Sequence, residues 1–134
     1  MIWLLRHGDA EEAAEDDAAR RLTKSGERQA EAVGRALEAL GAGVGACLTS
    51  PKVRARDMAR IACRGLGVEV DETELLGGGD FDPQQVAGQA SGQVGQAGNV
   101  LLVGHEPDLS RAIEDGTLIA LLTPTQLGAI AAPR

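Results

Sequence analysis

Residues 2–9 read Ile2-Trp3-Leu4-Leu5-Arg6-His7-Gly8-Asp9 and change abruptly from apolar to charged. A short apolar run of this kind is typical of a strand that is buried on both faces. The run places a guanidinium and an imidazole at the carboxyl end of that strand, where open α/β sheets bind their ligands. We therefore expect residues 1–5 to form a first strand and Arg6 and His7 to face a binding site.

The other histidine of the chain, His105, also follows an apolar run. That run is Asn99-Val100-Leu101-Leu102-Val103-Gly104, and its residues 99–103 read as a further buried strand. In a parallel sheet wound with right-handed crossovers, the carboxyl ends of the strands meet at one edge. His7 and His105 are therefore expected to face one crevice.

Strand-like and helical segments alternate along the chain. Residues 26–40 read as a helix with Ser25 as N-cap and with Val33, Leu37 and Leu40 on its buried face. A second helix is expected to open at Ser50-Pro51, with the serine as cap. The remaining expected elements are strands at 44–49, 68–70 and 117–122, a weak helix at 83–96, and a helix that starts at Pro107. This alternation predicts an α/β sheet with helices on both faces.

Composition and charge exclude several classes of function. The 134 residues suit one domain, and the net charge of −7 disfavours nucleic acid and anionic membranes as partners. Trp3 and Phe81 are the only aromatic residues, so the chain has no platform for stacking bases. No apolar run approaches the roughly 20 residues that span a bilayer, and no secretory leader is visible. We expect a cytoplasmic monomer in which Cys47 and Cys63 are buried thiols rather than a disulfide or a metal site.

Four residues are candidates for a single anion site: Arg6, His7, Arg54 and His105. Arg54 is expected in the first turn of the helix that follows the second strand. Two guanidiniums offer forked donors that match the oxygens of a phosphoryl group. Nearby cations also disfavour the protonated form of His7, so its neutral ring could attack phosphorus.

Backbone groups could complete this site. The start of the helix at Glu106-Pro107 would add N–H donors, and Gly8 and Gly104 remove side chains where an anion must approach the backbone. No residues stand at metal-ligand spacing, so we expect neither a metal nor another cofactor. The residues alone leave a phosphate-binding module and a phosphoryl-transfer enzyme as alternatives.

Three segments resemble the motifs of the histidine phosphatase superfamily, which has the phosphoglycerate-mutase-like fold. They are Leu5-Arg6-His7-Gly8, Thr49-Ser50-Pro51-Lys52-Val53-Arg54-Ala55 and Gly104-His105-Glu106-Pro107. A fourth segment, Arg21-Leu22-Thr23-Lys24-Ser25-Gly26, resembles a segment of the small SixA-type phosphohistidine phosphatases. The resemblance extends over about residues 1 to 113. We expect one histidine phosphatase domain over 1–134, with its part after about residue 113 shortened or incompletely represented.

The resemblance implies a role for each matching residue. His7 would be the nucleophile that forms a phosphohistidine intermediate, and Arg6, Arg54 and His105 would bind the phosphoryl group. Further contacts to the substrate would come from Gly8, Arg20 or Arg21, Ser50, Gly104 and Glu106. The implied fold is a mixed, mostly parallel central sheet between helices, in a small version without cap insertions.

The chain departs from its larger relatives in the segment 71–83. Those relatives carry a glutamate general acid there, whereas the acids of this short segment match no motif. An imidazole leaving group is protonated easily near neutrality and needs such an acid less than an alkoxide does. We therefore expect a metal-independent phosphatase that acts on phosphohistidine in a signalling protein. The alternatives are a phosphatase of small phosphorylated metabolites and a non-catalytic phosphate-binding module; a mutase is disfavoured because the insertions are missing.

Overall fold

The structure, a computed structural model, describes residues 2–12, 16–77, 98–105 and 121–122, together with residues 82, 85, 86, 88, 89 and 92. Its elements are β1 (Ile2–Arg6), η1 (Asp17–Ala19), α1 (Lys24–Ala39), β2 (Val44–Thr49), α2 (Val53–Arg64), β3 (Val70–Glu72), η2 (Glu74–Leu76), β4 (Asn99–Gly104) and β5 (Leu121–Leu122). The predicted helix at Pro107 lies outside the described residues, as does most of the one at 83–96. No helix in the described part of the chain is long and apolar enough to cross a membrane.

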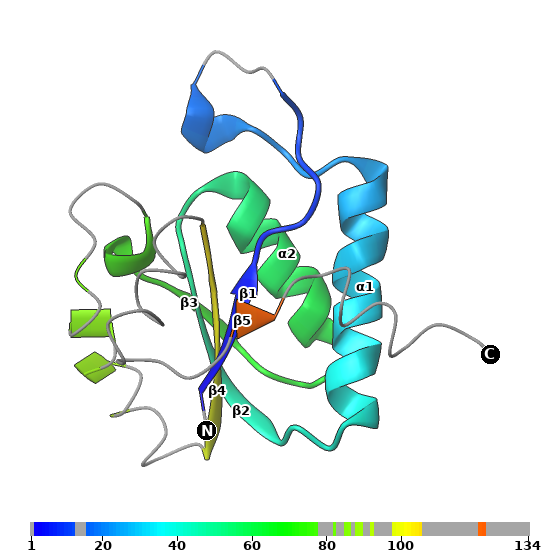
Figure 1. The fold of residues 1–134 in the computed structure, drawn as a ribbon, viewed down its shortest axis with the longest axis vertical. Coiled ribbons are helices and arrows are strands. Elements are labelled where there is room, and N and C mark those ends of the chain that lie inside the picture. Colours follow the sequence, from blue (N-terminus) through cyan, green and yellow to red (C-terminus); the bar gives the residue numbers. More distant parts are fainter. Residues whose placement is uncertain are drawn as a thin grey trace.

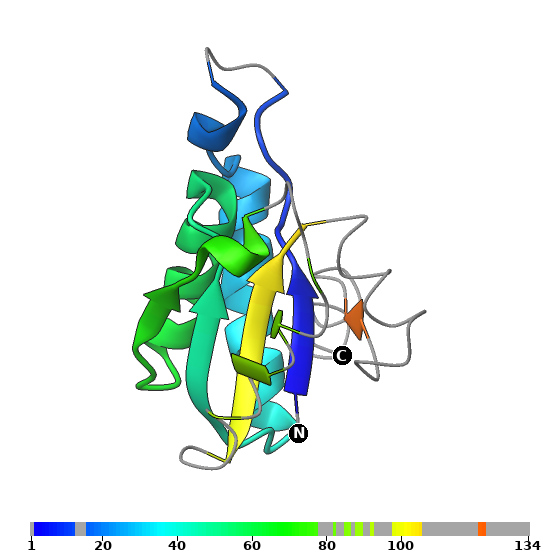
Figure 2. The ribbon, with the colours of Figure 1, turned by 90° about the vertical axis from the view of Figure 1, so that its left-hand side faces the viewer.

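The five strands form one sheet in the order β3-β2-β4-β1-β5, and each ladder between them is parallel. The connections β1-α1-β2 and β2-α2-β3 move in the same direction across the sheet. Right-handed crossovers then place both helices on one face, and Figures 1 and 2 show α1 and α2 together there, with η2 on the opposite side. The prediction of an α/β fold with a mostly parallel sheet is confirmed.

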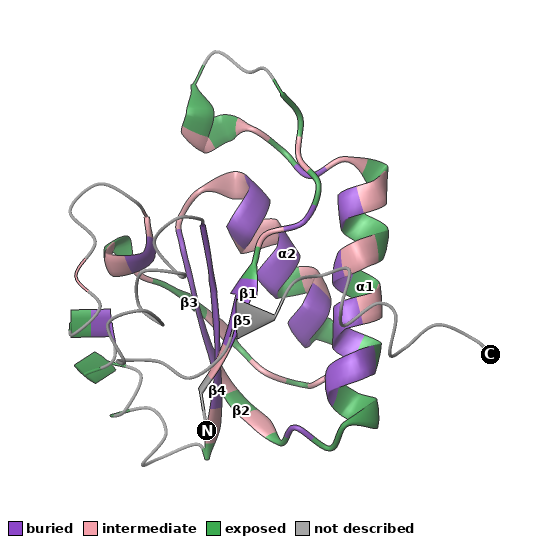
Figure 3. Cartoon of the chain, viewed as in Figure 1, coloured by how far each residue is buried: buried purple, intermediate pink, exposed green. Residues whose placement is uncertain are grey.

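Both faces of the central strands are buried. Leu5, Cys47, Leu101 and Val103 pack with the apolar side chains of α1 and α2, while the alternate residues Leu4, Leu48, Val100 and Leu102 are buried on the other face. This explains why β1 and β4 are continuous apolar runs rather than alternating ones. The buried residues of α1 and α2 lie on the sides that face each other and the sheet (Figure 3). The two cysteines are buried and free, as predicted.

Both predicted helix starts were wrong by a few residues. Thr23, not Ser25, caps α1, and its hydroxyl accepts a hydrogen bond from the Gly26 N–H at 3.0 Å. The same hydroxyl lies 2.7 Å from the Asp9 carboxylate, so a contact with a distant loop selects the cap. α2 begins at Val53, because the Ser50 hydroxyl accepts from the Lys52 N–H in the turn before the helix.

The end of α1 also differs from the prediction. Leu40, expected on the buried face, is 47% exposed because the helix ends at Ala39 and Leu40 is its C-cap. Gly41 follows with a φ of 64°, a left-handed conformation that stops a helix.

The close packing of α1 on α2 depends on Gly34. A Cβ at this position would lie 2.6 Å from the carbonyl oxygen of Ala62 on α2. We expect Gly34→Ala to lower the free energy of unfolding by about 1–3 kcal/mol, because the helices must separate, although alanine is otherwise the better helix former. Thermal denaturation measures this effect. Gly65→Ala is the matched control, since nothing lies within 4 Å of its Cβ; a Gly34→Ala variant as stable as the wild type would contradict the packing argument.

Candidate active site

The register of the sheet brings the two histidines together. Arg6 of β1 pairs with Gly104 of β4, and Thr49 of β2 pairs with Val103 of β4. The residues that follow these three strand ends are His7, His105 and Ser50, so they lie side by side at the carboxyl edge. The ring centroids of His7 and His105 are 5.2 Å apart with an angle of 56° between the rings. The prediction that both histidines share one crevice is thus supported by the geometry.

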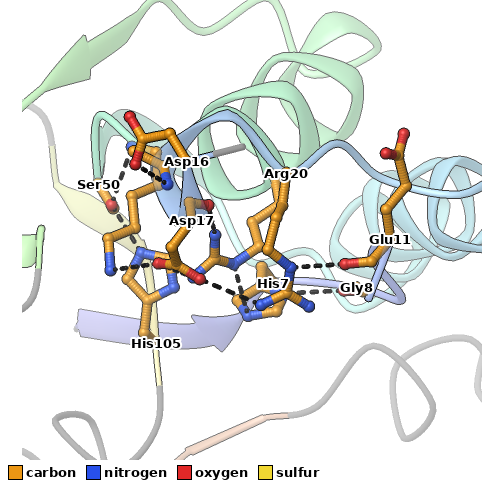
Figure 4. Close-up of polar contacts among 11 residues, drawn as sticks. His7, Gly8, Glu11, Asp16, Asp17, Arg20, Ser50 and His105 are labelled. Atoms are coloured by element: carbon orange, nitrogen blue, oxygen red, sulfur yellow. Dashed lines mark hydrogen bonds and ion pairs between the residues drawn. The ribbon is translucent and has the colours of Figure 1, made fainter. Parts of the chain in front are cut away.

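His7 is held by two contacts to the backbone. The backbone N–H of His7 donates to the Gly104 carbonyl at 3.1 Å, and Nδ1 of its ring lies 2.8 Å from the Gly8 carbonyl oxygen. A carbonyl can only accept, so Nδ1 carries the proton and Nε2 of the neutral ring carries the lone pair. Figure 4 shows His7 beside Gly8. The ring is therefore oriented with its nucleophilic nitrogen away from the backbone.

Arg54 approaches that nitrogen directly. The Nε–H of Arg54 donates to Nε2 of His7 at 3.3 Å, which requires an unprotonated Nε2. Burial lowers the pKa of His7, the hydrogen bond to Gly8 raises it, and the charges of Arg54, Arg6 and Arg20 lower it further. The net effect is a pKa below the usual value, so His7 is neutral near pH 7. Arg54 lies in the first turn of α2, as predicted, and is buried.

His105 directly follows the carboxyl end of β4, the central strand of the sheet, and is buried. Its Nε2 is 2.7 Å from the Ser50 hydroxyl oxygen (Figure 4). Burial and the neighbouring His7 and Arg54 lower the pKa of His105 to about 3, so its ring is neutral as well. Its Nδ1 is buried without a hydrogen-bond partner among the described residues, which leaves this atom able to bond a further group.

Three cations meet at one carboxylate that the sequence did not single out. Asp17 of η1 contacts Lys52 Nζ, Arg20 Nη1 and Arg54 Nη2, each at 3.2 Å, and its backbone carbonyl accepts from Arg54 Nη1 at 2.7 Å. Lys52, then Arg20 and Arg54, hold the pKa of Asp17 far below its usual range although the residue is exposed. Figure 4 shows Asp17 reaching over the two histidines. The cluster is therefore built to surround an anion.

The remaining predicted site residues fall into different places. Arg6 is exposed at the end of β1 and acts on His7 through its charge. Gly8 is buried, and a Cβ there would lie 2.9 Å from the Gln29 side chain and 3.2 Å from the Gly26 carbonyl, so Gly8 permits the loop to pack on α1. Gly104 contributes its carbonyl to His7, and Glu106 lies outside the described residues.

Arg20 and Arg21, the two predicted alternatives for a substrate contact, lie in different places. Arg20 is half-buried and binds Asp17 and the Glu11 carbonyl oxygen, within the cluster. Arg21 is exposed and lines a groove beside α2 instead. In the part of the chain that the structure describes, no group of three His, Cys, Asp or Glu side chains could hold a metal ion. The cluster offers a neutral, nucleophilic imidazole beside converging cations, which suits attack on a bound anion such as a phosphoryl group.

Comparison with known proteins assigns the family. The model of the histidine phosphatase superfamily, branch 1, matches residues 2–85, which is more than half of the chain. An uncharacterized protein of Picosynechococcus sp. (strain ATCC 27264 / PCC 7002 / PR-6) is 32% identical over 116 residues, which cover 84% of this chain and 70% of that protein.

Two solved structures show the same fold. The protein histidine phosphatase SixA complexed with tungstate has a TM-score of 0.74 and 22% identity, over 84% of this chain and 73% of its own. SixA of Nakamurella multipartitia has a TM-score of 0.72 and 26% identity, over 83% of this chain and 62% of its own. With its sequence motifs, its fold and these relatives, the chain belongs to branch 1 of the histidine phosphatase superfamily and is a phosphatase.

Proposed function

We propose that the chain removes the phosphoryl group from phosphohistidine on a protein, through a phosphohistidine intermediate on His7. Nε2 of His7 attacks the phosphorus, and the P–N bond to the substrate imidazole breaks. The leaving imidazole keeps the bonding electron pair and takes a proton from water. Water then attacks phosphorylated His7, the P–N bond to Nε2 breaks, and inorganic phosphate is released. The observation that carries this proposal is the neutral Nε2 of His7 in contact with Arg54.

The arrangement of cations supports the phosphoryl-binding step. Arg54 bonds Nε2 of His7 through its Nε and bonds Asp17 through its two Nη atoms. The guanidinium of Arg54 therefore lies between the Asp17 carboxylate and Nε2 of His7 and contacts both. In our proposal the phosphoryl group takes the place of the Asp17 carboxylate and is held by Arg54, Arg20 and Lys52, with Arg6 and His105 alongside. Transfer of a phosphoryl group requires mainly such positioning and charge neutralisation.

This exchange predicts a measurable competition between Asp17 and phosphate. Asp17→Asn removes the negative charge that Lys52, Arg20 and Arg54 bind in the structure. We therefore expect inorganic phosphate and orthovanadate to bind about fivefold more tightly, which corresponds to the ~1 kcal/mol of an exposed ion pair. Competitive inhibition constants give the value. Asp16→Asn is the matched control, because that neighbouring carboxylate only caps η1. Unchanged or weaker phosphate binding by Asp17→Asn would contradict the exchange.

The choice of phosphohistidine rests on the absence of a protonated acid in the described cluster. Asp17 is the carboxylate that reaches the cluster, and its pKa is far too low for it to carry a proton at neutral pH. Glu72 is engaged elsewhere, with Arg56 at 3.8 Å. A phosphoester would release a poor alkoxide leaving group without help, whereas a phosphoramidate releases an imidazole that protonates easily. The similarity to a structure named protein histidine phosphatase supports the same substrate class.

Comparative kinetics test this assignment. We expect kcat/KM on a protein phosphorylated on histidine to exceed that on small phosphoesters such as p-nitrophenyl phosphate by several orders of magnitude. The reverse order would overturn the proposal and favour a phosphatase of small phosphorylated metabolites. Failure of both substrate classes to turn over would contradict both assignments.

Removal of divalent ions is expected to leave activity unchanged. In our proposal Arg54, Arg20 and Lys52 neutralise the phosphoryl oxygens, so no metal is required for that task. Assays with and without excess EDTA measure the effect. Loss of activity in EDTA, with recovery after addition of a divalent ion, would show that the reaction depends on a metal.

A further inference from the structure

A groove of about 520 Å³ runs along α2. Its lining includes Ala19, which ends η1, and Val53, which begins α2. The same two elements form the contact between Asp17 and Arg54. η1 lies beyond the carboxyl ends of the strands, at the edge that carries the histidines (Figure 2). A molecule that presents a phosphoryl group to His7 would therefore extend naturally into this groove.

The groove is rich in arginine, in contrast to the acidic chain as a whole. Arg56, Arg60 and Arg64 line it from α2, and Arg21 lines it from the loop after η1. The three arginines of α2 are spaced by four residues, so they lie above one another on one face over about 12 Å. Two acids, Glu27 and Asp57, also line the groove, which leaves an excess of two positive charges there against −7 for the chain.

Most of these arginines are available to a partner. Arg56 lies near Asp57 and Glu72, at 3.6 and 3.8 Å. Arg21, Arg60 and Arg64 are exposed and form no ion pair among the described residues. Between the arginines the floor is partly apolar, formed by Leu22, Val53 and Ile61. Such a surface fits a segment that combines carboxylates with a few apolar side chains, since guanidiniums bind carboxylates with two parallel hydrogen bonds.

We propose that this groove docks an acidic segment of the protein that carries the phosphorylated histidine. The proposal rests on the proposed function and adds the chemistry that selects the substrate. Aspartates and glutamates spread over about 12 Å would meet the α2 arginines, while the phosphohistidine side chain reaches His7 past η1. Charges at an exposed rim act mainly on association, so they raise kcat/KM and make it sensitive to salt. No aromatic side chain is among the described residues that line the groove, which favours an acidic protein over nucleic acid.

Charge reversal along the groove tests the proposal. The variant Arg60→Glu/Arg64→Glu alters the groove and no residue of the histidine cluster. The matched control Lys24→Glu/Arg28→Glu makes the same charge change at exposed positions of α1 that line neither this groove nor the cavity next to it. Three substrates are compared: free phosphohistidine, a phosphohistidine peptide flanked by Asp and Glu, and the same peptide with Asn and Gln in their place.

We expect the wild type to prefer the acidic peptide over the neutral one by about tenfold in kcat/KM at low salt. The Arg60→Glu/Arg64→Glu variant should lose this preference, the control variant should keep it, and all three should hydrolyse free phosphohistidine equally. A wild type without the preference, or a groove variant that retains it, overturns the docking proposal alone. Failure of the wild type on all three substrates overturns the proposed function and this inference with it.

Discussion

Replacement of His7 with alanine is expected to abolish phosphatase activity, with a fall in kcat on the order of 10⁴-fold or more. The reaction that we propose begins with a covalent bond from Nε2 of His7 to phosphorus, and no other group in the described cluster can take this role. His105 is neutral too, but its ring is buried, whereas His7 is half-buried and more accessible to a substrate. Steady-state kinetics on a phosphohistidine protein give the effect.

The His7→Ala variant should fold normally, which separates loss of chemistry from loss of structure. The side chain is half-buried, and among the described residues it contacts Gly8, Arg54 and the His105 ring. Circular dichroism and the melting temperature should therefore stay close to the wild type. A folded His7→Ala variant with activity within tenfold of the wild type would remove His7 as the nucleophile.

Replacement of Arg54 with methionine is expected to lower kcat/KM by about 10³-fold, the range found when a charged donor to the transition state is removed. Arg54 contacts both the nucleophile and the bound carboxylate, so its loss affects the reactivity of His7 and the binding of the anion. Arg54→Lys keeps the positive charge without the fork of donors and should recover only part of the activity. Equal activity of Arg54→Met and the wild type would contradict this role.

The pH dependence of activity gives a second test of the role of Arg54. His7 must be neutral to attack, so activity falls as the pH drops through its pKa. The structure places that pKa below the usual value of 6.5, partly through the charge of Arg54. The acidic limb of the wild-type profile is therefore expected below pH 6.5, and Arg54→Met should move this limb to higher pH. A limb that stays in place would show that the charge of Arg54 does not contribute to the pKa of His7.

The sequence predicted which edge of the sheet carries both histidines, because these residues follow strands whose apolar patterns are strong. The predicted strands 1–5 and 99–103 are short apolar runs of the kind typical of strands buried on both faces, and the parallel pairing of β1 with β4 aligns His7 with His105. The strand at 44–49 was located without error, and Arg54 came in the first turn of the next helix as expected. These features depend on local pattern and on the handedness of crossovers, both of which are readable from one sequence.

Asp17 and the two helix caps were missed because they depend on contacts between distant segments. Asp17 stands in an acidic run and becomes distinct only when η1 folds over α2 and meets Lys52 and Arg54. Thr23 outcompetes Ser25 as the cap because it bonds to Asp9, fourteen residues earlier in the chain. Local propensity gave no signal for either contact. The sequence also offered no means of choosing between Arg20 and Arg21 as a substrate contact, because the two residues are adjacent and have identical side chains.

The most direct test of the account is to trap the enzyme during turnover of a phosphohistidine protein labelled in its phosphoryl group. Rapid quenching at high pH, followed by peptide mapping with mass spectrometry, locates any phosphoryl group on the chain. We predict a phosphoryl group on His7 that is stable in alkali, is lost in acid, and forms and decays at rates compatible with kcat. Turnover without a phosphorylated enzyme, or with the phosphoryl group on a residue other than His7, would contradict the account.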